Sequence, residues 1–209
     1  MHILIVSGRS GSGKTISLHA LEDLGYYCVD NIPVEMILSL VERLKSEHPL
    51  LAISIDSRNL PTDFSFLKEL LATLKTPESA CDILYLDAKD EALLTRFSET
   101  RRRHPLCQGN VSLREAIQKE RLLLAPLSEL ADIIIDSSTL SGAQLGNFIR
   151  EQIAPNPNGG IKILLESFGY KKGVPTDADF IFDVRCLANP YWEPSLRAYT
   201  GLDKEIIHF

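Results

Sequence analysis

Short runs of apolar and often β-branched residues alternate along this chain with segments whose apolar residues recur every three or four positions. Such runs predict buried strands, and the three- or four-residue spacing predicts amphipathic helices. The predicted strands cover residues 3–6, 26–29, 51–56, 82–87 and 132–136. Strands that alternate with helices imply crossover connections and a parallel sheet with helices on both faces. The pattern therefore predicts an α/β fold over residues 1–153.

The helical segments are defined by their apolar faces and by end signals. Their apolar positions are Leu18, Leu21 and Leu24, then Val34, Ile37, Leu38, Val41 and Leu44, then Leu67, Leu70, Leu71 and Leu74, then Leu93, Leu94 and Phe97. A further helix is predicted to begin at Ser112, because a serine followed three residues later by Glu115 forms a capping box. Proline has no amide hydrogen to donate, so Pro126 is predicted to interrupt that helix.

A change in composition after residue 153 predicts a second unit. Residues 154–160 are rich in Pro, Asn and Gly and contain no apolar anchor, which is typical of a linker. A predicted strand over 161–166 opens the unit 161–209, which we expect to be the incomplete start of a second α/β domain. About fifty residues form a small core, so we expect this unit to belong to a larger domain or to pack on a partner.

Composition narrows the class of protein. Hydrophobic residues are 44% and charged residues 24% of the chain, which is usual for a globular protein, and no run approaches a membrane span. The four cysteines are scattered without a CxxC pair, which disfavours a zinc site and predicts reduced thiols in the cytoplasm. A net charge of −6 argues against a surface that is basic throughout, although a local basic patch remains compatible with it.

The strongest functional motif lies between the first predicted strand and the first predicted helix. It matches the phosphate loop G-x-x-x-x-G-K-[ST] of P-loop NTPases, and the strand and helix are the context that the motif requires. We expect backbone amides and the helix N-terminus to hold the phosphates of ATP or GTP. Lys14 is predicted to contact the β- and γ-phosphates and to act in catalysis, and the Thr15 hydroxyl to ligate Mg²⁺. The predicted nucleotide-binding residues are Gly8, Arg9, Ser10, Gly11, Ser12, Gly13, Lys14 and Thr15.

A carboxylate at a strand end is expected to complete the metal site, usually through water. Asp56 is the first candidate for this metal-binding and catalytic position, and Asp30 is the second. Asp87 and Asp136 also end predicted strands, at the sheet edge where open α/β sheets bind ligands. Each of these carboxylates could equally cap a loop.

An arginine cluster follows the fourth predicted helix, at Arg101, Arg102 and Arg103, with His104 beside it. Such a cluster could stabilise the charge of a triphosphate or contact nucleic-acid phosphates. A basic helix end exposed to solvent is the alternative interpretation, because positive charge is favourable at a helix C-terminus.

Several segments together carry a resemblance that covers the whole chain. They are GRSGSGKT (8–15), VDNIP (29–33), SIDSRN (54–59), RRRHPL (101–106), FGYKKGVP (168–175) and ADFIFDVRCLANPYW (178–192). In this order they resemble the RapZ/YvcJ family of P-loop nucleotide-binding proteins. The stretch in the second unit is the most specific, because a phosphate loop alone occurs in many unrelated families.

The resemblance implies particular ligands and partners. It implies ATP at residues 8–15 and GTP contacts at Asp56, Ser57, Arg58 and Asn59, with weak hydrolysis at most. It also implies a homo-oligomeric RNase adapter that binds small regulatory RNA and ribonuclease E and senses an amino-sugar phosphate. Family members continue beyond the segment 200–203 into a basic tail that contacts RNA. We therefore expect this chain to be truncated relative to them.

Residues of the second unit allow two interpretations. Lys171 and Lys172 beside Gly173 could bind the phosphate of a sugar, with Arg185 or Asn189 lining the site. Alternatively, the apolar stretch 180–184 could be a core strand.

Two other functions compete with a regulatory adapter. The first is a small-molecule P-loop kinase, in which Asp30 or Asp56 would position the acceptor hydroxyl. The second is a GTPase-like switch, which the sequence disfavours because it contains no N-K-x-D motif for the base.

Overall fold

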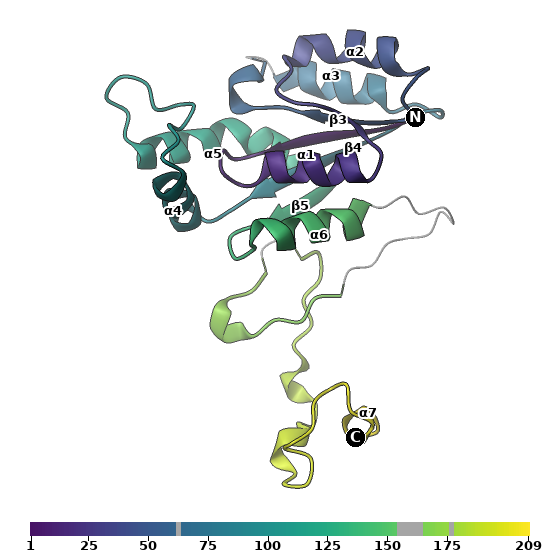
Figure 1. The fold of residues 1–209 in the computed structure, drawn as a ribbon, viewed down its shortest axis with the longest axis vertical. Coiled ribbons are helices and arrows are strands. Elements are labelled where there is room, and N and C mark those ends of the chain that lie inside the picture. The colour runs from purple at the N-terminus through teal and green to yellow at the C-terminus, as the bar shows by residue number, and fades with distance from the viewer. Residues whose placement is uncertain (62–63, 154–164, 176–177) are drawn as a thin grey trace. The chain divides into compact units, whose positions relative to one another are not determined.

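The computed structural model describes residues 1–61, 64–153, 165–175 and 178–209 (Figure 1). The chain divides into two compact units, Met1–Asp177 and Ala178–Phe209. Each is described by itself below. None of the described helices combines the length and apolarity that a bilayer crossing requires.

A five-stranded parallel sheet forms the centre of the first unit. Its strands are β1 (His2–Gly8), β2 (Tyr27–Val29), β3 (Leu50–Ser54), β4 (Ala80–Asp87) and β5 (Ile133–Asp136). They lie in the order β2-β3-β1-β4-β5, and each one overlaps a strand predicted from the sequence. In the middle of the sheet, Val6 of β1 is in register with Ser54 of β3 and Leu84 of β4. The carboxyl ends of β1 and β3 consequently carry the phosphate loop and Asp56 side by side.

Helices cover both faces of the sheet, as the alternating pattern predicts (Figure 1). One face is covered by α1 (Lys14–Asp23) and α6 (Gly142–Ile153), which pack on Leu4 and Val6 of β1. The other is covered by α2 (Ile37–Leu44), α3 (Phe64–Leu74) and α5 (Leu113–Glu129), which pack on Ile3 and Ile5. The two sets of β1 side chains alternate because successive residues of a strand face opposite sides.

A smaller cluster joins α4 (Asp90–Thr100) to α5 near the phosphate loop. Leu93 and Phe97 of α4 pack there against Ile117 of α5. Two short 3₁₀ helices, η1 (Val34–Met36) and η2 (Ser57–Asn59), follow β2 and β3.

The predicted interruption of α5 at Pro126 is wrong. The helix begins with the predicted capping box, in which Ser112 N donates to Glu115 Oε2 at 2.8 Å, and it continues through Pro126 to Glu129. Pro126 lies in the last turn, so it removes only the hydrogen bond to the carbonyl of Leu122. Leu122 is on the exposed side of the helix, where water can replace that bond.

The segment after α6 differs from the sequence expectation. The predicted strand over 161–166 falls largely outside the described residues, and Leu165 and Glu166 belong to no strand. The compact unit Ala178–Phe209 contains the short helices η4 (Val184–Cys186), η5 (Pro190–Trp192) and α7 (Lys204–Ile207). The interpretation of 180–184 as a core strand is contradicted, because Phe180 and Phe182 are 81% and 79% exposed.

Candidate functional site

The phosphate loop has the backbone that its glycines permit. Gly8, Gly11 and Gly13 have φ values of 145°, 86° and 113°, which side chains disfavour. Gly8 also lies where β1 and β4 approach closely, because a Cβ there would be 2.2 Å from the carbonyl oxygen of Leu86. The loop conformation thus depends on glycine for both torsion and space.

The side chain of Arg9 points into the protein and holds the start of α4. It is 2% exposed, and its Nη1 donates to the carbonyl of Ala88 at 2.9 Å, while Nη2 donates to Asp90 Oδ1 at 2.5 Å. Arg9 was predicted as a nucleotide-binding residue from the motif. Because the side chain is engaged in these contacts, only the backbone of Arg9 is left to contribute to nucleotide binding in the phosphate loop.

Arg96 and Ser137 hold the phosphate loop from outside, and sequence patterns did not reveal them. Arg96 Nη1 donates to the carbonyl of Gly11 at 3.0 Å, and Ser137 Oγ donates to the carbonyl of Ser12 at 2.7 Å. Arg96 Nη2 also donates to the carbonyl of Ser137 at 2.5 Å. Two carbonyls of the loop are therefore fixed by α4 and by the residue after β5.

The ammonium group of Lys14 folds back over its own loop. Its Nζ donates to the carbonyl of Gly8 at 2.5 Å and to that of Arg9 at 3.2 Å. Burial lowers the pKa of Lys14, although the negative charges of Glu120, Asp56 and Asp30 act in the opposite direction. Negative charges from three separate segments therefore act on the lysine of the motif.

Asp56 is held by Arg58, two residues further along the chain. Arg58 Nε and Nη2 donate to the two carboxylate oxygens at 3.0 Å each, and Arg58 N donates to Asp56 Oδ1 at 2.9 Å. Burial alone would raise the pKa of Asp56, but the hydrogen bonds from Arg58 and the charge of Lys14 keep it below its usual value. Nearby, Asn59 Nδ2 donates to Asn31 Oδ1 at 2.7 Å, which joins the ends of β2 and β3.

Replacing Arg58 with alanine is expected to raise the pKa of Asp56, because burial remains while the strongest partner is lost. A depressed carboxyl pKa stabilises the folded state above the unfolded value of about 3.9, and this contribution disappears as the pH falls through the folded pKa. The variant should therefore be less stable than the wild type at neutral pH, and the difference should disappear as the pH falls below about 4, through the folded pKa of Asp56. Carboxyl NMR titration and urea unfolding measure both effects.

The exposed ion pair of Arg43 with Glu47 supplies the control for that experiment. Arg43→Ala should change stability little at either pH, because exposed pairs contribute little. A stability loss in Arg58→Ala that is equal at both pH values would contradict the assigned role of Asp56.

The remaining predicted carboxylates have different surroundings in the structure. Asp87 and Asp136 cap their own loops, because they accept hydrogen bonds from the backbone amides of Ala88 and Ser138 at 2.8 Å each. Asp30 is exposed after β2, on the side of Lys14 and Arg58. Thr15 is exposed at the start of α1. Within the described residues, no group of three His, Cys, Asp or Glu side chains could hold a metal ion.

Glu120 is a central residue of the site that the sequence did not indicate. It is fully buried on α5, and its carboxylate accepts hydrogen bonds from Ser10, Ser57 and His104. His104 is likewise buried, whereas the three arginines before it are exposed. The structure therefore brings together the phosphate loop, the segment 56–59 and the end of the arginine cluster.

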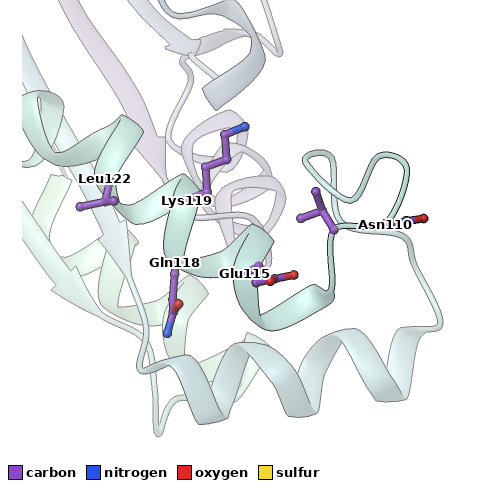
Figure 2. Close-up of a pocket in the computed structure, with 6 residues that line it drawn as sticks. Asn110, Glu115, Gln118, Lys119 and Leu122 are labelled. Carbon is purple, nitrogen blue, oxygen red and sulfur yellow. The ribbon is translucent and has the colours of Figure 1, made fainter.

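Two hollows lie away from these residues. One of about 550 Å³ is on the N-terminal half of α5, where Asn110, Glu115, Gln118, Lys119 and Leu122 line it (Figure 2). The other, of about 270 Å³, lies between α1 and α6 and includes Ile16 and Gly146. Neither contains a residue of 8–15 or 56–59.

Comparison with known proteins gives the family. The RapZ-like N-terminal domain matches residues 1–157, and the RapZ C-terminal domain matches residues 161–209. The chain belongs to the RapZ family. A nucleotide-binding protein of Pseudomonas fluorescens is 51% identical over 213 residues, which cover all of this chain and 75% of that protein. A nucleotide-binding protein of Azotobacter vinelandii has the same identity and coverage.

Solved structures show that this RapZ-family chain has a kinase-like α/β fold. Shikimate kinase from Acinetobacter baumannii has a TM-score of 0.50 and 20% identity, over 72% of this chain and 92% of the kinase. The tunicamycin resistance protein of Deinococcus radiodurans has a TM-score of 0.50 and 16% identity, over 75% of this chain and all of that protein. The predicted P-loop fold of the kinase-like kind is confirmed.

Proposed function

We propose that this chain is a nucleotide-binding regulatory protein that binds ATP or GTP at the phosphate loop and hydrolyses it weakly at most. The observation that carries the proposal is the position of Lys14, whose Nζ rests on the neutral carbonyls of Gly8 and Arg9. A phosphate oxygen carries negative charge and is a stronger partner for an ammonium group than a carbonyl is. A triphosphate would therefore draw Lys14 away from its own loop.

The surrounding residues supply the other parts of such a site. The N-terminus of α1 provides backbone amides and a favourable dipole for the phosphates. The Thr15 hydroxyl and the Asp56 carboxylate are hard oxygen donors of the kind Mg²⁺ prefers, so both fit a magnesium ion bound together with the nucleotide. Bound Mg²⁺ would neutralise charge on the phosphates.

Weak turnover is supported by the pairing of Asp56 with Arg58. Both carboxylate oxygens accept hydrogen bonds from the guanidinium group, so Asp56 would share its oxygens between Arg58 and the magnesium ion and would hold the ion less tightly than an unpaired carboxylate would. Such a site favours holding a nucleotide over consuming it.

Family membership and three exposed surface features support the regulatory part of the proposal. We propose that the protein is a self-associating RNase adapter that binds small RNA, ribonuclease E and an amino-sugar phosphate. The exposed cluster Arg101 to Arg103 is suited to RNA phosphates. Lys171 is exposed beside Gly173 and is suited to a sugar phosphate. The exposed aromatic residues of the second unit, among them Phe182 and Trp192, are suited to association.

The test combines nucleotide and RNA binding. We expect the protein to bind a fluorescent ATP analogue that both ATP and GTP displace, and to retain small RNA with an affinity that falls as salt rises. Replacing Arg101, Arg102 and Arg103 together with glutamine should weaken RNA retention and reduce its salt dependence. Failure to bind any triphosphate would refute the proposal, and failure to bind RNA would refute its adapter part.

A small-molecule kinase is the second candidate, and exposed Asp30 favours it. A carboxylate on the side of the phosphate loop could orient an acceptor hydroxyl. Incubation with labelled ATP and a panel of amino sugars and other metabolites separates the two functions. Fast transfer of phosphate that depends on one acceptor, and that is lost in Asp30→Asn, would favour the kinase over the adapter.

A further inference from the structure

The carboxylate of Glu120 joins three segments that are distant in the sequence. Its Oε1 accepts hydrogen bonds from Ser10 Oγ at 2.6 Å and Ser57 Oγ at 2.9 Å. Its Oε2 accepts from Ser10 N at 2.8 Å and from His104 Nε2 at 3.1 Å. One buried group thus receives hydrogen bonds from the phosphate loop, from the segment after β3 and from the segment after α4.

Glu120 is buried as a charged group. Burial by itself would raise its pKa, but the hydrogen bonds from His104 and Ser10 and the charge of Lys14 keep the pKa below its usual value. A buried carboxylate is costly unless its partners are in place. The positions of the three segments are therefore linked, because displacing any one of them leaves this charge with fewer donors.

His104 transmits this link to the arginine cluster. Leu106 N donates to His104 Nδ1 at 3.1 Å, so Nε2 carries the hydrogen that is donated to Glu120. The imidazole ring also packs on Phe97, with 5.1 Å between the ring centroids. The backbone directly after Arg103 is consequently fixed against α5, while the three arginine side chains remain exposed.

We propose that Glu120 is a positioning residue that makes the phosphate loop, the segment 56–59 and the segment 101–104 one nucleotide site. This inference rests on the proposed nucleotide binding. It has two consequences. First, one chain binds one nucleotide, so ATP and GTP exclude each other. Second, a nucleotide on the phosphate loop changes the exposure of the arginine cluster through Ser10, Glu120 and His104.

Two substitutions separate this role from general stabilisation. Glu120→Ala removes all four hydrogen bonds. Glu120→Gln can retain them, because its oxygen can accept from Ser10 N and His104 Nε2 while its amide donates to the two serine hydroxyls, which act as donors or acceptors. Glu129→Ala, an exposed position on the same helix, is the matched control.

The measurements are the affinity and stoichiometry of a fluorescent ATP analogue and the rate of trypsin cleavage after Arg101, Arg102 and Arg103. For the wild type we expect one nucleotide per chain, competition by GTP, and slower cleavage when nucleotide is bound. Glu120→Gln and the control should bind within about threefold of the wild type. Glu120→Ala should bind about tenfold more weakly or worse, as expected for lost hydrogen bonds to a charged group. Its cleavage rate should no longer depend on nucleotide.

Circular dichroism establishes whether each variant is folded. If Glu120→Ala is unfolded, His104→Ala decides the question, because it removes only one of the four hydrogen bonds to Glu120 together with the link to the arginines. It should bind nucleotide more weakly than the wild type, by a smaller factor than expected for Glu120→Ala, and it should lose the effect of nucleotide on cleavage. Nucleotide-dependent cleavage in either folded variant, or two nucleotides bound to one chain, would overturn the inference while leaving nucleotide binding intact. A wild type that binds no nucleotide would overturn both.

Discussion

Replacing Lys14 with alanine is expected to abolish measurable triphosphate binding, with a loss of about 100-fold or more. The size follows from the loss of charge-assisted hydrogen bonds to the phosphates, of which each contributes about 1.5 to 3 kcal/mol. Titration of the protein with a fluorescent nucleotide, or calorimetry, measures the change. The folded state should lose some stability as well, because the charge of Lys14 helps to keep the pKa values of Asp56 and Glu120 below their usual range. Circular dichroism therefore has to show that the variant is folded.

The exposed Lys68 on α3 supplies the control, because Lys68→Ala removes the same charge away from the phosphate loop. That variant should bind nucleotide like the wild type. Unchanged affinity in Lys14→Ala would show that residues 8–15 are not the nucleotide site.

Replacing Gly8 with alanine is expected to destabilise the fold by about 3 kcal/mol or more, which corresponds to a fall in Tm of about 10 °C for a chain of this size. The added Cβ would lie 2.2 Å from the carbonyl oxygen of Leu86, on a residue with a φ of 145°. Neither backbone can move without breaking the pairing of β1 with β4. Thermal unfolding followed by circular dichroism measures the effect.

Gly109 is a matched control for this prediction. It also has a positive φ, of 59°, but an added Cβ there meets nothing within 4 Å. Gly109→Ala should therefore cost only the backbone strain, about 1 kcal/mol. Equal losses of stability at the two positions would refute the close approach of Gly8 to Leu86.

The sequence predicted the fold of residues 1–153 well because its signals are local. Strand runs, the capping box at Ser112 and the phosphate loop each depend on residues that are neighbours in the chain. Pro126 was misjudged because the cost of a helical proline depends on how close it lies to the helix end, which periodicity does not reveal.

The partners within the site could not be predicted because they come from distant segments. Glu120 lies 110 residues from Ser10 along the chain and 63 from Ser57, and its position in an ordinary amphipathic helix resembles that of a solvated charge. Arg96 is similar, because only the folded structure brings it to the carbonyl of Gly11. Arg9 shows the reverse case, in which a motif residue has its side chain engaged elsewhere.

The side chains that α5 directs into the protein limit where this family can accept insertions and deletions. Each added residue turns a helix by about 100°. One insertion between Glu120 and Leu124 would leave either the carboxylate or the buried leucine facing water. The stretch 105–111, which joins His104 to the capping serine, is free of that restriction. We therefore expect insertions and deletions among relatives to gather in that loop and to be excluded from the helix between Ile117 and Leu127.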